Sequence, residues 1–222
     1  GKGALSPRDE YCLYCVGLGA RDIVVSAFED ADLVLCIGYD MVEWHPDRWN
    51  VGRATRIVHI DTLPAEVDQA YNPDVEIVGD IRIALEAINA GLTDSHRKEP
   101  HRLAELRGRM TAELREHDDD SAFPMKPQRM ISDLRSAMRD DDILISDVGA
   151  HKMWIARHYP TYEPRTCVIT NGFCSMGFAL PAAIAAKRLH ADRNVVALCG
   201  DGGFLMNVQD LITAVRYDTP IT

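Results

Sequence analysis

Short apolar runs alternate with amphipathic segments along the sequence, and this alternation constrains the fold more than any other feature. The runs have the length and composition of buried strands. They occupy residues 32–38, 56–61, 76–79, 143–146, 167–169 and 195–199. Strands that alternate with helices favour a parallel sheet with helices packed against it. The sequence therefore predicts an α/β fold with a largely parallel sheet.

Capping signals mark the ends of several helices between these runs. Asp80 is a good N-cap for a helix over residues 81–90, and Gly91 is a suitable stop. Pro127 suits the first turn of a helix that reaches about residue 138. The remaining helical segments are predicted at residues 21–30, 101–117, 176–189 and 205–216.

Two α/β blocks are separated by a polar region. Residues 93–100 are polar, a charged helix is predicted next, and Asp118, Asp119 and Asp120 break its pattern. Such charge runs usually lie in solvent. We predict a first domain over residues 1–92, a linker with a charged helix over 93–124, and a second domain over 125–222.

Composition excludes several classes of protein. The net charge of the 222-residue chain is −10, and no basic segment stands out, so nucleic-acid binding is not expected. No apolar run approaches the roughly 20 residues that span a bilayer, and the N-terminus has no signal-peptide pattern. We therefore expect a cytoplasmic protein without a membrane or nucleic-acid partner.

The six cysteines fit a reducing compartment. Cys12 and Cys15 have CxxC spacing, but the sequence offers no second pair, no nearby histidine ligands and no thioredoxin-like context. A structural role is therefore favoured for this pair over a metal or redox site.

Two segments that follow predicted strands have the residue types of a ligand site, and ligands bind at that edge of open α/β sheets. Residues 146–151 (SDVGAH) pass through Gly149 into a helix, whose first N–H groups attract phosphate. Residues 171–181 (NGFCSMGFALP) place Met176 among small residues that permit close backbone approach to a flat ligand. Alone, each segment is equally consistent with a plain turn or a tightly packed helix.

A third segment, residues 195–204, is an apolar strand that ends in Gly200, Asp201, Gly202 and Gly203. Aspartate can bind a hard cation such as Mg²⁺, and glycines let backbone N–H groups approach a diphosphate. A lone Gly-Asp-Gly is often only a turn, but this one lies between a buried strand and a predicted helix. That position favours the functional interpretation.

The first block also ends two strands in acids, Asp40 and Asp61, which could each hold a ribose hydroxyl. No GxGxxG accompanies them. A nicotinamide-binding Rossmann domain is therefore poorly supported.

Taken together and in this order, the three segments of the second block resemble the thiamine-diphosphate-dependent enzymes. Gly200-Asp201-Gly202 resembles the start of the family's metal and diphosphate motif. Residues 171–181 resemble the segment that grips the aminopyrimidine ring, and residues 149–151 the loop that contacts the diphosphate from the other side. The resemblance implies parallel-sheet, three-layer α/β/α domains: a central domain and a diphosphate-binding domain, both incomplete.

Within this family, acetolactate synthase is the closest resemblance. Residues 147–154 (DVGAHKMW) are similar to its GxHxxW segment, and residues 177–184 (GFALPAAI) are similar as well. Residues 35–40 (LCIGYD) resemble the central domain of the catabolic branch, which lacks flavin. Flavin binding stays open, with its absence favoured.

The resemblance implies a role for each matching residue. Asp201 would be a Mg²⁺ ligand, Cys174 would offer its carbonyl and Met176 its N–H to the pyrimidine. The Met176 side chain would hold the cofactor bent. The full set of implied cofactor-binding residues is Gly149, Ala150, His151, Cys174, Ser175, Met176, Gly200, Asp201, Gly202 and Gly203. Many relatives have Gln at the place of Ala150 and Gly at that of Cys174.

The same comparison predicts that the chain is part of a longer enzyme. The activating Glu of the family belongs to an N-terminal domain, and its second metal ligand, an Asn, falls just beyond Thr222. We therefore expect no catalytic residue within this chain and no activity from the chain alone.

The resemblance implies an enzyme that decarboxylates pyruvate and transfers the hydroxyethyl unit to a second 2-oxo acid, giving 2-acetolactate. A homodimer or homotetramer is expected, since the family's cofactor sits between subunits. Three alternatives stay open: another thiamine-diphosphate enzyme acting on 2-oxo acids, a non-catalytic module that has kept the fold, and a plain nucleotide-binding protein.

Overall fold

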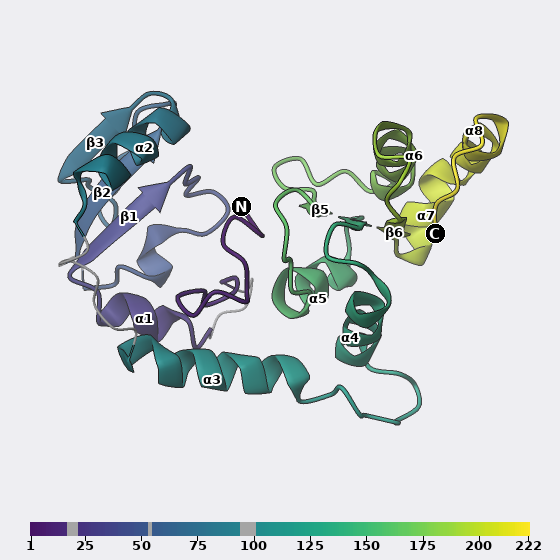
Figure 1. Ribbon diagram of the computed structural model, residues 1–222, viewed down its shortest axis with the longest axis horizontal. Coiled ribbons are helices and arrows are strands. Elements are labelled where there is room, and N and C mark those ends of the chain that lie inside the picture. The colour runs from purple at the N-terminus through teal and green to yellow at the C-terminus, as the bar shows by residue number, and fades with distance from the viewer. Residues whose placement is uncertain (17–21, 53–54, 94–100) are drawn as a thin grey trace. The chain divides into compact units, whose positions relative to one another are not determined.

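The computed structural model describes residues 1–16, 22–52, 55–93 and 101–222. The chain forms two compact units, one of Arg21–Leu103 and the other of Gly1–Ala20 together with Ala104–Thr222. Figure 1 shows both as sheets with helices packed against them. The start of the chain thus packs with the second unit. The predicted division, with boundaries at residues 92 and 124, contains no such long-range association. Those boundaries stay a prediction.

The unit Arg21–Leu103 is built on a three-stranded parallel sheet in the order β1-β2-β3. Its elements are α1 (Val25–Glu29), β1 (Leu33–Ile37), the 3-10 helix η1 (Pro46–Arg48), β2 (Arg56–Asp61), β3 (Val75–Val78) and α2 (Ile81–Gly91). Asp80 caps α2, because its side chain accepts a hydrogen bond from Ile83 N, as the sequence predicts. The core of this unit packs Cys36 and Ile57 against Trp49 and Tyr71.

The second unit contains the other parallel sheet, in the order β5-β4-β6. Its elements are α3 (His101–Arg115, which begins in the first unit), α4 (Pro127–Ala137), β4 (Ile143–Ser146), α5 (Ala150–His158), β5 (Cys167–Ile169), α6 (Ala179–Leu189), β6 (Val195–Leu198), α7 (Asp201–Asn207), the 3-10 helix η3 (Val208–Asp210) and α8 (Leu211–Arg216). Pro127 begins α4, which confirms the predicted helix start.

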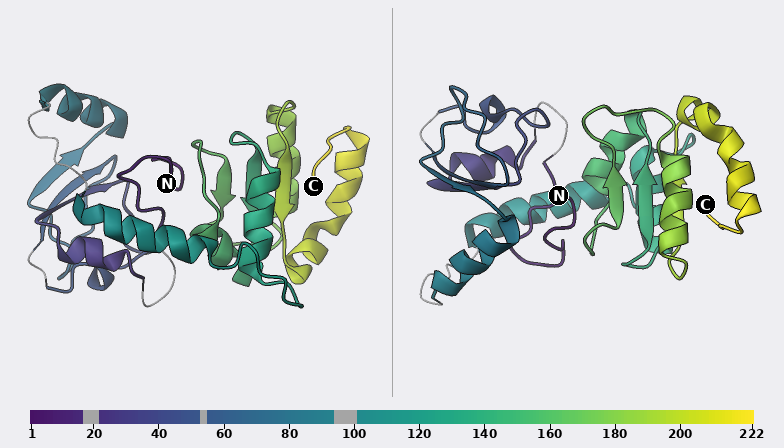
Figure 2. Two further views of the ribbon diagram at one scale, coloured as in Figure 1. Left: turned by 60° about the horizontal axis from the view of Figure 1, so that its bottom comes forward. Right: turned by 90° about the horizontal axis from the view of Figure 1, so that it is seen from above.

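Helices cover both faces of this second sheet, which makes it a three-layer α/β/α unit (Figure 2). On one face, Leu144 of β4 packs with Ile131 of α4 and Ile155 of α5. On the other face, Ile145 packs with Ala179 and Ala183 of α6. Successive residues of a strand point to opposite faces, so the uninterrupted apolar run in β4 serves both layers.

Beyond β6, the chain departs from the single helix predicted over residues 205–216. The observed helix α7 begins earlier, at Asp201, and ends at Asn207, whose φ of −130° leaves the helical region. The Asn207 side chain donates to Gly177 O at 2.6 Å, a tertiary contact that apolar periodicity does not reveal. A 3-10 turn and α8 complete the segment.

The central strand β4 is fixed at its amino end by the fully buried carboxylate of Asp142. This carboxylate accepts hydrogen bonds from the backbone and guanidinium of Arg139, and from the backbone and side chain of Asn194. Asp142 therefore joins the end of α4, the start of β4 and the start of β6.

Candidate functional site

The three segments singled out in the second block lie together at the carboxyl edge of the sheet β5-β4-β6. β4 ends at Ser146, β5 at Ile169 and β6 at Leu198, and each segment is the connection that follows one of these parallel strands. The carboxyl ends of parallel strands share one edge, where open α/β sheets bind ligands.

His151 connects the first segment to the third. Its imidazole lies against two glycines: a Cβ added at Gly149 would lie 2.9 Å from His151 Cε1, and one at Gly200 would lie 3.6 Å from the same atom. Gly149 also has φ +153°, which side chains rarely adopt. The 149–151 loop and the Gly-Asp-Gly turn are therefore in contact through this ring.

Met176 connects the second segment to the third. A Cβ added at Gly202 would lie 3.2 Å from the Met176 methyl carbon, so a side chain there would displace this methionine. The side chain of Met176 is 45% exposed, although methionine is usually buried. It therefore lies over the Gly-Asp-Gly turn with one side open to solvent.

Asp147 contacts all three segments through its side chain. Its fully buried carboxylate accepts hydrogen bonds from Val148 N at 2.6 Å, from Gly177 N at 3.0 Å and from Ala179 N at 3.4 Å. A Cβ added at Gly203 would lie 3.0 Å from this carboxylate. All three segments thus meet at Asp147, to which the sequence assigned no role.

A buried carboxylate needs several donors, and two of those of Asp147, Gly177 N and Ala179 N, come from a loop that is distant in sequence. The only sign of this role in the sequence was the position of Asp147 directly after a buried strand, and an acid at such a position also fits a simple turn. Burial and the Asp147 carboxylate also act on the neighbouring thiol of Cys199, and together they raise its pKa to about 11. Cys199 is therefore a protonated, structural thiol.

The turn at Gly177 is fixed from a second side by α7. Gly177 has φ +84°, and a Cβ there would lie 2.7 Å from Asn207 Nδ2, which donates to Gly177 O. Both the backbone conformation and the available space therefore require glycine. This contact ties the end of α7 to the second segment.

Cys174 adopts the left-handed region, with φ +47°. Its sulfur lies 3.3 Å from Lys152 Nζ on α5 and 3.5 Å from Thr170 O. Such a backbone favours glycine. The segment therefore keeps the glycine conformation although cysteine occupies the position.

Asp201 begins α7 with an exposed side chain, whose oxygen accepts a hydrogen bond from Gly202 N at 2.8 Å. Ala150 and Ser175 are exposed in the neighbouring connections, at the start of α5 and before Met176. In the part of the chain that the structure describes, no group of three or more His, Cys, Asp or Glu side chains could hold a metal ion. Asp201 is therefore an exposed carboxylate at the start of α7 and belongs to no such cluster among the described residues.

The first unit carries its own cavity of about 340 Å³ at the carboxyl ends of β1 and β2. Gly38, Asp40, His59 and Asp61 line it, so the two acids noted in the sequence do lie together. The Asp61 carboxylate accepts hydrogen bonds from Thr62 N and Leu63 N, and these outweigh burial and lower its pKa.

Comparison with known families agrees with this geometry. Residues 1–88 match the profile of the thiamine pyrophosphate enzyme central domain, and residues 147–222 match that of the thiamine pyrophosphate enzyme C-terminal TPP binding domain. The chain therefore belongs to the thiamine pyrophosphate enzyme family, as its motifs predict. The second profile begins at Asp147, the carboxylate that joins the three segments.

Individual relatives narrow the resemblance. The chain is 37% identical to acetolactate synthase of Bacillus subtilis (strain 168) over 87% of its length, and 37% identical to the catabolic acetolactate synthase of Raoultella terrigena over all of it. It is 32% identical, again over its whole length, to a probable acetolactate synthase large subunit of Methanocaldococcus jannaschii.

The chain spans between 34% and 40% of the length of these relatives. Within the described residues, no helix has both the length and the apolar character needed to cross a membrane. Fold and family are thus established for this chain, and the activity of the whole enzyme is a separate question.

Proposed function

We propose that this chain is the cofactor-binding portion of an acetolactate synthase-like enzyme, which uses thiamine diphosphate to decarboxylate pyruvate and transfer the two-carbon unit to a second 2-oxo acid. One observation carries the proposal. The three motif segments meet at a single sheet edge, where a Cβ added at Gly149, Gly177 or Gly203 would lie within 3.0 Å of a neighbouring side chain. The similarity to named acetolactate synthases supports the choice of reaction.

The residues present fit a diphosphate. The first N–H groups of α7 belong to Asp201, Gly202 and Gly203, and N–H groups at such a position have no backbone carbonyl partner within their helix. Gly202 N donates to the Asp201 side chain, a bond that a diphosphate would replace. Gly149, Ala150 and His151 begin α5 at the same edge. Two helix starts rich in glycine can therefore donate backbone hydrogen bonds to one anion.

The residues also fit a flat ring beside that diphosphate. In our proposal Cys174 offers its carbonyl, Met176 its N–H, and the Met176 side chain supports the bent cofactor, with Ser175 alongside. The exposed position of Met176 above Gly202 leaves the methionine available for that contact.

For the metal, we propose Mg²⁺ with Asp201 as one ligand. Mg²⁺ takes about six oxygen ligands, and cofactor phosphates and water usually supply several of them. Asp201 is exposed at the start of α7, next to the proposed diphosphate cradle. One carboxylate alone is a weak site, so we propose that tight binding needs other parts of the enzyme.

Thiamine diphosphate supplies the electron sink for decarboxylation, and the protein orients it. Asp147 keeps the Gly177 turn and the start of α7 at fixed positions, because it accepts from Gly177 N and packs against Gly203. Asn207 holds the same turn from α7. These residues keep the donors aligned before a ligand arrives, which lowers the cost of binding.

We further propose that the whole enzyme is a cytoplasmic homodimer or homotetramer without flavin, and that this chain alone is inactive. The similarity to a catabolic acetolactate synthase supports the branch without flavin. The chain covers 34% and 40% of the length of two acetolactate synthases, which supports the proposal that activity needs further domains.

Calorimetric titration of thiamine diphosphate with Mg²⁺ tests the proposal on this chain and on one extended at both ends. We expect tight, Mg²⁺-dependent binding in the extended protein, and Asp201→Ala should abolish it. Asp192→Ala is the matched control, because Asp192 is exposed before the opposite end of the same strand, β6. Binding that is absent in both proteins, or equally lost in the control, would contradict the assignment. Product analysis with pyruvate then tests acetolactate formation.

A further inference from the structure

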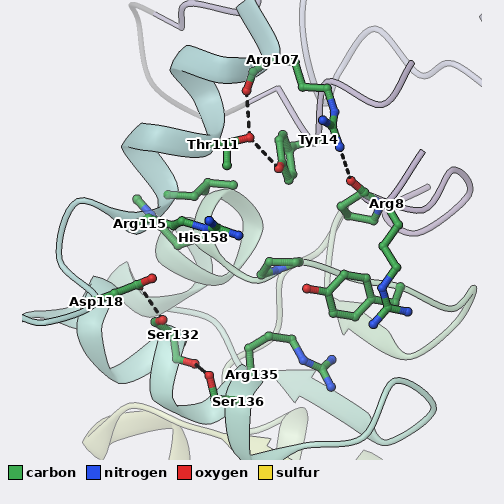
Figure 3. Close-up of a pocket in the computed structure, with 14 residues that line it drawn as sticks. Arg8, Tyr14, Arg107, Thr111, Arg115, Asp118, Ser132, Arg135, Ser136 and His158 are labelled. Atoms are coloured by element: carbon green, nitrogen blue, oxygen red, sulfur yellow. Dashed lines mark hydrogen bonds between the residues drawn. The ribbon is translucent and has the colours of Figure 1, made fainter. Parts of the chain in front are cut away.

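A second cavity lies within the unit of Gly1–Ala20 and Ala104–Thr222 (Figure 3). It shares no lining residue with the site at the carboxyl edge of the sheet β5-β4-β6. The start of the chain, α3, α4 and the end of α5 form its walls. Its volume is about 520 Å³, within the range of roughly 300–1,000 Å³ typical of small-molecule sites. The ionisable side chains that line it, apart from tyrosine, are Arg8, Arg107, Arg115, Arg135, His158 and Asp118.

The lining is basic, whereas the chain as a whole has a net charge of −10. Four arginines face the cavity beside a single carboxylate, Asp118, which already accepts a hydrogen bond from Ser132 at 2.6 Å. A cavity with this excess of cations attracts anions.

Two of the four arginines have structural partners. Arg8 pairs with Asp140. Arg135 donates to Tyr159 Oη at 2.7 Å and to Met138 O at 2.7 Å, and its guanidinium lies 4.9 Å from the centre of the Tyr159 ring. These two arginines therefore shape the wall, and Arg107 and Arg115 retain N–H groups that make no hydrogen bond within the described residues.

Arg115 and Arg107 lie two turns apart on α3. Within the described residues, the Arg115 guanidinium makes no hydrogen bond or ion pair, and the side chain is exposed. Arg107 donates one terminal N–H to Pro7 O at 2.9 Å. Its Nε is buried without a hydrogen-bond partner in the described part of the chain.

His158 closes the same wall from the end of α5. The residue is only 9% exposed, and its Nδ1 is buried without a hydrogen-bond partner among the residues that the structure describes. Burial lowers the pKa of His158, which favours a neutral ring that donates from one nitrogen. Buried nitrogens without partners are rare in proteins, and this cavity has two in its lining.

We propose that this cavity binds a small organic anion through a phosphate or carboxylate group held by Arg115 and Arg107, with His158 as an additional donor. Arginine matches both groups because its planar fork makes paired, charge-assisted hydrogen bonds. Tyr14 and Ser136 also line the cavity, and their hydroxyl groups suit the polar remainder of such a ligand. The Tyr14 hydroxyl is hydrogen-bonded to the Thr111 hydroxyl at 2.9 Å.

The test is a nuclear magnetic resonance titration of the 222-residue chain that follows the arginine Nε–Hε signals. Glycerol 3-phosphate and succinate, at matched ionic strength, are the two probes. A saturable shift with only one probe identifies phosphate or carboxylate as the recognised group. We expect Arg115→Gln to weaken binding about tenfold or more, because the anion loses its charge-assisted hydrogen bonds to the guanidinium.

Arg109→Gln is the matched control, because Arg109 is exposed on the same helix and does not line the cavity. It should bind the probe as the unchanged chain does. No saturable shift with either probe would overturn the proposal. Equal weakening of binding in both variants would also overturn it. Unchanged binding in Arg115→Gln would overturn it too, because the anion would then bind elsewhere. None of these residues belongs to the thiamine diphosphate site, so the two proposals fail independently.

Discussion

The buried carboxylate of Asp147 accepts a hydrogen bond from the backbone N–H of Gly177 at 3.0 Å. These residues follow different strands and are 30 positions apart in the sequence. A Cβ added at Gly203 would lie 3.0 Å from the Asp147 carboxylate, and one added at Gly177 would lie 2.7 Å from Asn207 Nδ2 at the end of α7. The geometry at the carboxyl edge of the sheet β5-β4-β6 depends on this pair.

Replacing Asp147 with alanine should destabilise the protein by about 2–4 kcal/mol, because buried backbone N–H groups lose their acceptor. Asp147→Asn should cost less, since one acceptor oxygen remains. Urea unfolding measures both changes. Asp133→Ala is the control, because Asp133 pairs with Arg129 on the surface and should contribute less than about 1 kcal/mol. Equal losses in Asp147→Ala and Asp133→Ala would contradict the role of Asp147.

Gly177→Ala should destabilise the protein by about 1–3 kcal/mol, because the added methyl group meets Asn207 and the residue has a positive φ. A double-mutant cycle separates the two causes. In the background of Asn207→Ala the steric part should shrink to the contact with Met206 Cβ at 3.1 Å, and the conformational part should stay. Strictly additive losses in the cycle would show that the two residues are not in contact.

Cys174→Gly should change stability by less than about 1 kcal/mol, because relief of the left-handed strain offsets the flexibility that glycine adds to the unfolded chain. The proposed cofactor contact uses the backbone carbonyl, so thiamine diphosphate binding to the extended protein should persist. Cys174→Val should instead cost about 1–3 kcal/mol, since β-branched residues avoid this conformation. Calorimetry and thermal unfolding check both variants. Loss of cofactor binding in Cys174→Gly would assign a role to the thiol.

Asp142 should make the protein sensitive to acid. Burial alone would raise the pKa of Asp142, but hydrogen bonds from Asn194 and Arg139 outweigh it and hold the pKa well below its usual range. A carboxyl group with a lowered folded-state pKa stabilises the fold above its unfolded pKa of about 3.9, and this contribution is lost as the pH falls below that value. Asp142→Asn should lower the free energy of unfolding at neutral pH and make that free energy depend less on pH in the acid range.

Urea unfolding at several pH values compares Asp142→Asn with the unchanged protein. The difference in the free energy of unfolding between the two should shrink as the pH falls below about 4. A constant difference across the whole pH range would contradict the lowered pKa of Asp142.

The sequence was sufficient to predict the strands, the parallel sheet and the meeting of three segments at one edge, because apolar runs and strand ends are local signals. The role of Asp147 was missed, since its donors at Gly177 and Ala179 lie on another connection. The break at Asn207 was missed for the same reason, because its cause is a contact with Gly177. The association of residues 1–16 with the second unit is also long-range and leaves no periodic pattern.

The order β5-β4-β6 has a consequence for how this site could arise. The chain that leaves β4 turns to α5 on one face of the sheet, and the chain that leaves the adjacent β5 turns to α6 on the other. The two connections must diverge, so an opening between them is a property of the topology and not of particular side chains. Related sequences could therefore exchange the residues at its mouth, and with them the substrate, while the backbone keeps the opening itself.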